Sequence, residues 1–244
     1  MIKNLFREAF KCKETQCTII SDKKQGIQTA IDSIKHNRKE LEEYARANPM
    51  FLYTLEPLPV PTEPLVAKLM AEAAEKANVG PMAAVAGVLA DLAVEDMIRD
   101  GCEVAVVENG GEVSAVSKEP IDVALAAGDA PLSKRFGFRL ENFPMGIATS
   151  SGRFSHALSF GDAEAATVFC RNAGLADAVA TAVGNVVKGP DHRMAIQQGI
   201  DKALSIREVE GVLIIYEGMV GTGGRIPQLI KVAPNNIEVW RSTR

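Results

Sequence analysis

The stretch EVAVVENGGEVSAVS, residues 103–117, places two apolar, β-rich runs on either side of Gly110 and Gly111. A glycine pair between two such runs is typical of the tight turn of a β-hairpin. Hairpin strands pair antiparallel, which sets this chain apart from folds in which strands and helices alternate strictly. The stretch therefore predicts an α+β fold, with a mixed or antiparallel sheet layer covered by helices.

The segments before and after this hairpin contain the same kinds of element. Apolar residues at helical spacing predict helices at 26–49, 64–78, 82–101, 174–185 and after Pro190. Short apolar runs predict further strands at 17–21, 143–150, 156–161, 166–170 and 211–218. A proline-rich segment at 57–64 is expected to be an extended connector. No fixed-period repeat is visible, but two helix-plus-hairpin halves indicate an internal duplication.

Composition and charge indicate a globular protein and argue against a nucleic-acid-binding or membrane-spanning one. The chain has 244 residues, of which 47% are hydrophobic and 24% charged, with a formal net charge of −4. We expect a single domain over residues 1–244 and, without a basic excess, no nucleic-acid partner. The apolar run 81–94 is interrupted by Asp91 and is shorter than the roughly 20 residues of a membrane span. The N-terminus has no apolar signal core, so a cytoplasmic location is expected.

Asp177 and Thr181 lie four residues apart in the apolar segment GLADAVATAV, residues 174–183. On a helix this spacing places both side chains on one face, where they can reach the same point. A carboxylate and a hydroxyl suit Mg²⁺, which commonly uses one or two protein groups together with phosphate oxygens of a ligand. The alternative is structural. In that case Asp177 caps a helix start and Thr181 bonds back to a carbonyl.

Three further stretches, 78–87, 107–113 and 148–161, combine glycines with polar side chains. A glycine-proline turn before a helix exposes N–H groups that suit an anion, and a glycine pair lets the backbone approach a ligand closely. The hydroxyls of the TSS sequence can donate hydrogen bonds to phosphate or flavin. The cofactor-binding candidates are Gly80, Asn109, Gly110, Gly111, Glu112, Thr149, Ser150 and Ser151.

His156 is the candidate acid–base catalyst beside these stretches, and a hydrogen-bonded structural histidine is the alternative. No complete phosphate-binding loop is present, because GTGG at 221–224 is not followed by a helix and is expected to form a turn. The chain also lacks the G-x-S-x-G sequence of a serine nucleophile. Hydrolase catalysis is therefore disfavoured.

In this order, four segments resemble the ApbE superfamily, and in particular its short cytosolic branch. They are NVGPMAAVAGVLAD (78–91), VVENGGEV (106–113), IATSSGRFSHALSFG (147–161) and GLADAVATAVGN (174–185). The upstream segments KETQCTII and ANPMFLYTLEPLPVP are also similar to that branch, so the likeness covers most of residues 13–190. The resemblance implies an α+β fold of the T-fold-like kind.

ApbE proteins proper are magnesium-dependent flavin transferases that split FAD and attach FMN to a protein threonine. The resemblance implies that Asp177 and Thr181 are the side-chain metal ligands, with a backbone carbonyl from 80–87 as a third ligand. Magnesium would then neutralise the pyrophosphate, and His156 would assist proton transfer at the accepting hydroxyl, which makes Asp177 and His156 the catalytic candidates. The family's flavin or nucleotide cradle matches Gly110, Gly111, Thr149 and Ser150.

The chain also departs from the transferases. Ala86 stands where they carry a lysine before glycine, and the IDP-TG element that should follow His156 is absent. Three interpretations follow: an FAD- or FMN-binding enzyme with Mg²⁺-dependent FMN-transferase chemistry, a non-catalytic flavin-binding module, or a partner protein in sulfur assimilation into homocysteine. The last is supported by the free thiols expected of Cys12, Cys17, Cys102 and Cys170 in a reducing compartment.

The three interpretations imply different partners. A flavin nucleotide is the small-molecule ligand in the first two, and the first also requires a protein acceptor. The third requires a sulfur-transfer partner. The apolar helices expected at 82–95 and 175–187 are in addition candidates for a homodimer interface.

Overall fold

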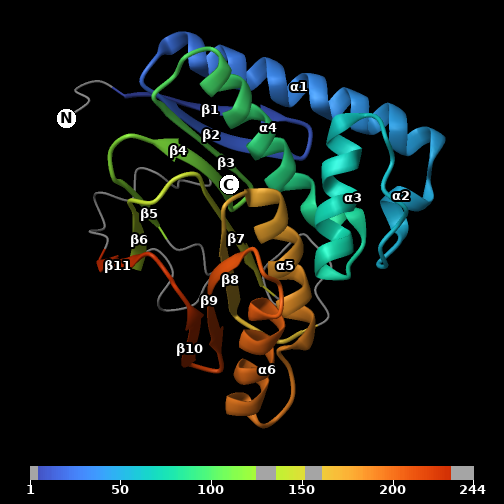
Figure 1. The fold of residues 1–244 in the computed structure, drawn as a ribbon, viewed down its shortest axis with the longest axis vertical. Coiled ribbons are helices and arrows are strands. Elements are labelled where there is room, and N and C mark those ends of the chain that lie inside the picture. The colour runs from blue at the N-terminus through green and yellow to red at the C-terminus, as the bar shows by residue number, and fades with distance from the viewer. Residues whose placement is uncertain (1–4, 125–135, 152–160, 232–244) are drawn as a thin grey trace.

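The computed structural model describes residues 5–124, 136–151 and 161–231. Within them, eight strands form one sheet in which every neighbouring pair is antiparallel (Figure 1). In spatial order these strands are β1 (Phe6–Cys12), β2 (Thr15–Ser21), β3 (Val104–Asn109), β4 (Glu112–Ser117), β7 (Met145–Ser150), β8 (Ala165–Cys170), β9 (Val209–Tyr216) and β10 (Met219–Gly224). A smaller antiparallel sheet contains β11 (Gln228–Lys231), β6 (Phe136–Leu140) and β5 (Ile121–Ala124).

The helices follow the first hairpin of each half of the large sheet. They are α1 (Lys24–Ala47), α2 (Met50–Tyr53), α3 (Leu65–Ala77), the 3₁₀ helix η1 (Pro81–Ala84), α4 (Val85–Arg99), α5 (Ala173–Val186) and α6 (His192–Leu204). In each half a second hairpin then pairs beside the first: β3-β4 beside β1-β2, and β9-β10 beside β7-β8. The two halves join where β4 pairs with β7, with Val113 opposite Ile147. The predicted antiparallel α+β fold is confirmed, and its two halves share one plan.

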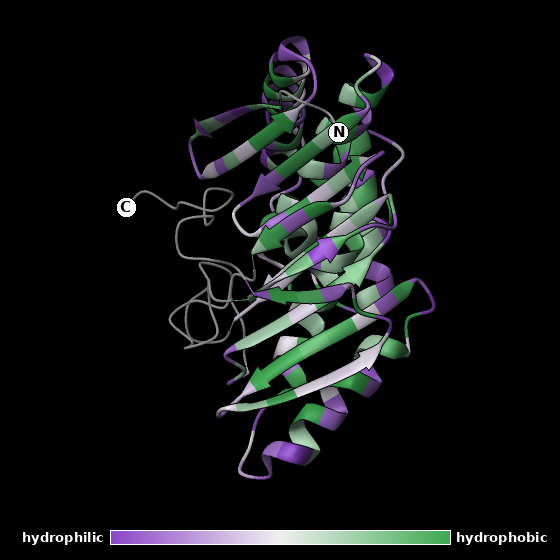
Figure 2. Cartoon of the chain, turned by 90° about the vertical axis from the view of Figure 1, so that its left-hand side faces the viewer, coloured by the Kyte–Doolittle hydropathy of each residue, from purple (hydrophilic) through white to green (hydrophobic). Residues whose placement is uncertain are grey.

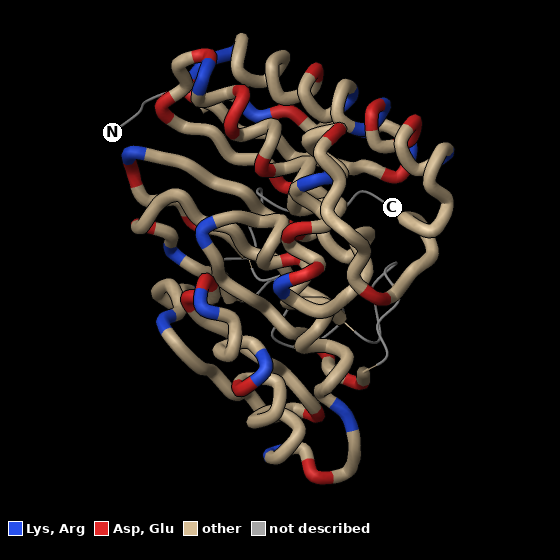
Figure 3. Tube along the Cα trace, turned by 45° about the vertical axis from the view of Figure 1, so that its right-hand side comes forward, with Lys and Arg blue, Asp and Glu red and all other residues tan. Residues whose placement is uncertain are grey.

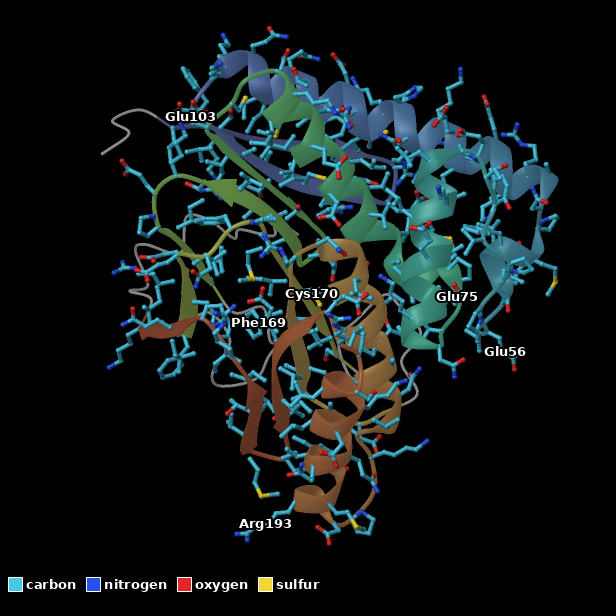
Figure 4. All side chains as sticks on the ribbon, viewed as in Figure 1. Glu56, Glu75, Glu103, Phe169, Cys170 and Arg193 are labelled. Atoms are coloured by element: carbon cyan, nitrogen blue, oxygen red, sulfur yellow. The ribbon has the colours of Figure 1, made fainter. Side chains whose placement is uncertain are left out.

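The sheet separates two apolar cores, because successive side chains of a strand point to opposite faces. On β3, Ala105 and Val107 pack against α1 and α4, whereas Val106 packs on the face covered by β5 and β6. On β8, Phe169 and Cys170 likewise belong to different cores (Figure 4). Figure 2 shows the helices on one side of the sheet. Side chains that share a functional site must therefore be assigned to a face as well as to a strand.

Helix α1 is the outermost layer of the first half. Its apolar stripe, which includes Ile27, Ile31 and Ile34, is buried against the sheet and α4. Acidic and basic residues line the rest of the helix (Figure 3), and neighbours such as Lys39 and Glu43 form exposed pairs one turn apart. Most charges of α1 are thus those of an ordinary solvated helix face, whereas Arg38 is mostly buried and donates to Glu14 and Thr15 of the first hairpin.

Helices α4 and α5 cross at their first turns, at a separation that requires glycine. A Cβ atom on Gly87 would overlap the carbonyl group of Ala173, and a Cβ atom on Gly174 would lie 2.5 Å from Cγ2 of Val88. Beneath them, Gly146 of β7 leaves room for the backbone at Asn172, where α5 begins. Three glycines therefore bring the N-termini of both helices together over the middle of the sheet.

The structure corrects one expectation about local structure. GTGG at 221–224 is not a turn but the end of strand β10. Gly221 and Gly223 lie beneath Ile196 and Ile200 of α6, where a Cβ atom would overlap these side chains. The glycines are thus explained by the close approach of a helix to an edge strand. The expected strand at 156–161 lies, except for its last residue, outside the described residues.

The apolar helices that were candidates for a homodimer interface lie in the chain's own core. Residues such as Leu89 and Leu92 of α4 and Leu175 and Val179 of α5 are buried, so the chain's own core accounts for their apolar character, and a homodimer stays a prediction. Among the described residues no single helix is long and apolar enough to cross a membrane. Leu65–Ala77 and Pro81–Arg99 meet the length and composition criteria only as a pair bent by 102°.

The core between the two sheets gives a test of the fold. Phe169 and Phe138 are buried and meet edge to face, with ring centroids 4.9 Å apart. We expect Phe169→Ala to lower the free energy of unfolding by roughly 3–5 kcal/mol, because it removes this contact and leaves a cavity. The control is Phe6→Ala on the edge strand β1, where the side chain is 42% exposed. Urea unfolding that shows equal losses for both variants would contradict this packing.

Candidate functional site

Asp177 lies one turn into α5 and reaches across to α4. Its Oδ2 accepts a hydrogen bond of 3.0 Å from the backbone N–H of Gly87, and the N–H of Ala86 donates to the same carboxylate. The start of α5 itself is capped by Asn172, whose Oδ1 accepts from the N–H of Leu175 at 2.8 Å. Asp177 does cap a helix, but it caps the neighbouring helix in space instead of its own.

Asp91 on α4 makes the reciprocal interaction. Its two carboxylate oxygens accept from the N–H groups of Ala173 at 2.9 Å and Gly174 at 2.8 Å, the first two residues of α5. Ser114 on β4 donates a further hydrogen bond from below. Each helix therefore provides the carboxylate that binds the positive N-terminus of the other.

Sequence analysis missed the role of Asp91, although a signal was present. Helix α4 contains AGVLAD at 86–91 and α5 contains AGLAD at 173–177, so each carries an Ala-Gly followed one turn later by Ala-Asp. The two halves of the duplicated fold thus contribute one such helix each. A comparison of these two helices would have pointed to Asp91.

Glu112 adds a third carboxylate to this region. It is the first residue of β4, and its neighbours Asp177 and Glu108, together with burial as the main cause, raise its pKa well above the usual range. Burial also raises the pKa of Asp177 to about 7, against the effect of its two N–H partners, and Asp91 raises it further. Among the described residues, no lysine or arginine pairs with Asp177 or Glu112 within the distance of an ion pair. Asp177 and Glu112 therefore hold their protons more tightly than ordinary carboxyl groups do, and no cationic side chain among the described residues takes the place of these protons.

The predicted Gly-Gly turn joins β3 to β4 as expected. Gly110 and Gly111 have φ angles of 71° and 122°, which explains why both positions are glycine. Their N–H groups are already engaged, since Gly110 donates to the carbonyl of Gln16 and Gly111 donates to Oε1 of Glu108 at 2.7 Å. Any contact of this turn with a ligand must therefore use other atoms, or these N–H groups must exchange partners.

Asn109 connects this turn to the start of α4. Its buried side chain donates from Nδ2 to the carbonyl oxygen of Ala86 at 3.0 Å. The backbone N–H of Ala86 donates to the carboxylate of Asp177. Ala86 is thus held on both sides, through its carbonyl by Asn109 and through its N–H by Asp177.

The hydroxyl residues at the end of β7 divide between the two faces of the sheet. Ser150 lies on the helix face, whereas Thr149 lies on the opposite face, where its Oγ1 is 2.9 Å from Thr167 Oγ1, and Ser151 follows the end of the strand. The hydroxyl of Ser151 is buried and has no hydrogen-bond partner among the residues that the structure describes. The pairing of β4 with β7 nevertheless puts this strand end and the Gly-Gly turn at the same edge of the sheet.

The remaining predicted residues are Thr181, Gly80 and His156, of which the structure describes the first two. Thr181 is half-buried one turn after Asp177 on α5, as its spacing predicted. Gly80 precedes η1 and is buried against the backbone carbonyl of Thr54, so packing alone accounts for a glycine there. His156 lies outside the described residues. Within the described part of the chain, no three His, Cys, Asp or Glu side chains converge as a ready metal site.

Glu108 gives a test of the electrostatics on the opposite face. Burial raises its pKa to about 7 from 4.5, despite hydrogen bonds from Gly111 and Thr18. The stability linked to the protonated carboxyl group is therefore fully present below pH 4.5 and is lost as the pH rises to about 7. We expect Glu108→Gln to stabilise the protein at pH 8 by on the order of 1 kcal/mol, allowing for partial solvation, and to give no gain at pH 4.5.

Urea unfolding at both pH values measures this effect. The control is Glu103→Gln, which removes an exposed carboxylate paired with Lys118 and should cause at most a small loss at either pH. A gain from Glu108→Gln that is the same at both pH values would contradict the expected linkage.

Comparison with known proteins assigns the chain to a family. The family model described as "AbpE bacteria" matches residues 3–210. A UPF0280 protein of Methanococcus vannielii is 38% identical over 233 residues, covering 93% of this chain and 94% of the relative. One of Methanocaldococcus jannaschii is 36% identical over 231 residues, covering 93% of both chains.

Solved structures agree on the fold at low sequence identity. The chain is similar to the flavinyl transferase ApbE of Pseudomonas stutzeri, with a TM-score of 0.61, 13% identity, and coverage of 90% of this chain and 94% of that one. It is also similar to the ApbE protein of Thermotoga maritima, with a TM-score of 0.62, 12% identity, and coverage of 94% and 97%. By sequence match and by fold, the chain belongs to the AbpE bacteria family and is an ApbE-like protein.

Proposed function

We propose that this protein binds a flavin nucleotide, FAD or FMN, together with a Mg²⁺ ion beside Asp177. The observation that carries the proposal is the pair of carboxyl groups at the crossing of α4 and α5, where Asp177 and Glu112 share a half-buried region and, among the described residues, have no lysine or arginine partner. Buried carboxylates are ordinarily paired with a cation or coordinate a metal. A divalent cation fits this set of oxygen donors.

The residues that would hold the ion are Asp177 and Thr181 from α5 and a backbone carbonyl within residues 80–87, for which we propose Ala86. All three donors are oxygen atoms, as Mg²⁺ prefers. Asn109 and Asp177 fix the backbone of Ala86 from two sides, so this carbonyl is held in place before any ion binds. When bound, Mg²⁺ supplies positive charge against the pyrophosphate of the nucleotide.

The end of β7 and the Gly-Gly turn are proposed to contact the flavin nucleotide. Ser151 has a buried hydroxyl without a partner in the described part of the chain, and a bound ligand would satisfy it. Ala86 replaces the lysine of the transferases, so this chain offers less positive charge of its own to a pyrophosphate. Nucleotide binding is therefore expected to depend strongly on the divalent cation.

For catalysis, we propose transfer of FMN from FAD to an acceptor hydroxyl of a protein. The hydroxyl oxygen forms a new bond to the FMN phosphorus, the bond to the AMP phosphate breaks, and AMP leaves. His156 takes the proton of the hydroxyl. The alternative is a non-catalytic flavin-binding module, supported by the missing lysine and IDP-TG element. Release of AMP from FAD with Mg²⁺ distinguishes the two.

The metal-binding proposal predicts the effect of one substitution. Asp177→Asn keeps an oxygen that can accept from Gly87 but removes the charge, so we expect Mg²⁺-dependent FAD binding to weaken at least roughly tenfold. Calorimetric titration of FAD with Mg²⁺ and with EDTA measures this loss. The control is Asp201→Asn, an exposed carboxylate on α6. FAD binding that is equally tight in Mg²⁺ and in EDTA would refute the proposed role of the ion.

The sulfur-transfer alternative predicts a reactive thiol. Cys12 is partly exposed, whereas burial raises the pKa of the Cys17 and Cys170 thiols to about 12 and Cys102 is also buried. A thiol reagent at pH 8 should therefore modify Cys12 in the native protein and the other three only after unfolding. Peptide mapping by mass spectrometry identifies the modified residue. Rapid native modification of Cys17 or Cys170 would contradict this order and favour a sulfur-handling role.

A further inference from the structure

We infer that Asp91 is a positioning residue for Asp177. This inference rests on the proposed function for its consequence in metal binding, but its structural part stands independently. Asp91 has Ala173, Gly174 and Ser114 as donors to its carboxylate. Its hydrogen-bonding capacity is thus directed to protein groups, so that Asp91 acts on a ligand only through α5.

The first turn of α5 is the element through which Asp91 acts. The carboxylate holds the N–H groups of Ala173 and Gly174, and Asp177 follows within one helical turn. A small displacement of this turn would move the Asp177 carboxylate away from the Gly87 N–H. Tight contact at Gly87 and Gly174 leaves the helices little room to compensate by sliding.

The two carboxylates are chemically different, although their places in the duplicated fold correspond. Asp91 accepts hydrogen bonds from three protein groups and has the exposed carboxylate of Glu95 as an acidic neighbour. By contrast, Asp177 accepts from two N–H groups and has the half-buried carboxyl group of Glu112 as an acidic neighbour. One helix turn beyond Asp91 the chain has Glu95, while one turn beyond Asp177 it has Thr181. One of two equivalent carboxylates thus fixes the geometry, and the other is left to meet the ligand.

Amide hydrogen exchange by NMR tests the structural part without any ligand. We compare the wild type with Asp91→Asn, and use Glu95→Gln as a control that removes a nearby exposed charge on the same helix. Asp91→Asn replaces one of the two accepting oxygens by an NH₂ group, which donates and would oppose one of the two N–H groups, so α5 should shift. The expected result is exchange of the Gly87 amide at least roughly tenfold faster in Asp91→Asn and unchanged in Glu95→Gln.

The Gly111 amide, which donates to Glu108 outside this contact, is the internal reference. Faster exchange at Ala173 and Gly174 with unchanged protection at Gly87 would overturn the inference, because Asp91 would then cap α5 without positioning Asp177. A uniform acceleration that includes Gly111 would also overturn it, because Asp91 would then be a general stabiliser of the fold.

Binding of Mn²⁺ alone, followed by electron paramagnetic resonance, tests the consequence for the metal. Asp91→Asn should weaken Mn²⁺ binding roughly tenfold, as loss of an outer partner of a ligand does, and should add no further loss to Asp177→Asn. Additive losses would overturn the action through Asp177. A wild type that binds no Mn²⁺ would refute the proposed metal site, while the exchange at Gly87 would still decide the role of Asp91.

Discussion

The reciprocal exchange of carboxylates between α4 and α5 is the interaction on which the rest of the candidate site depends. Asp91 and Asp177 each bind backbone N–H groups in the first turn of the opposite helix. These N–H groups have no partners within their own helix, and the negative charge is favourable at the positive end of the helix dipole. The exchange joins the two halves of the duplicated fold at the centre of the sheet (Figure 1).

This arrangement also explains why charge accumulates where it does. Helices that cross at Gly87 and Gly174 bring their acidic residues close together, and the first residue of β4 adds Glu112 beneath them. The backbone N–H groups offset part of the charge, but the pKa of Asp177 is still raised to about 7 by burial. On the proposed function, a divalent cation would replace the protons of these carboxyl groups and would offer its charge to a phosphate-bearing ligand.

Local patterns in the sequence predicted what depends on neighbouring residues. The glycine pair at 110–111 predicted a hairpin because positive φ angles at both positions favour glycine, and the spacing of Asp177 and Thr181 placed both on α5. Contacts between distant segments were not predictable in this way. Asp91 meets its partners 82 and 83 residues further along the chain. The strand at Gly221–Gly224 was missed because its glycines are required by the close packing of α6, which lies earlier in the chain. Thr149 and Ser150 point to opposite faces of the sheet, which composition does not reveal.

The central claim is that a cation binds where Asp177 of α5 meets the start of α4. Anomalous scattering from crystals grown with Mn²⁺ and FAD tests it most directly, because it locates the ion without reference to activity. The account predicts a peak beside the Asp177 carboxylate and the Thr181 hydroxyl, absent from crystals of Asp177→Asn. A peak elsewhere, or FAD bound with no ion at this position, would contradict it.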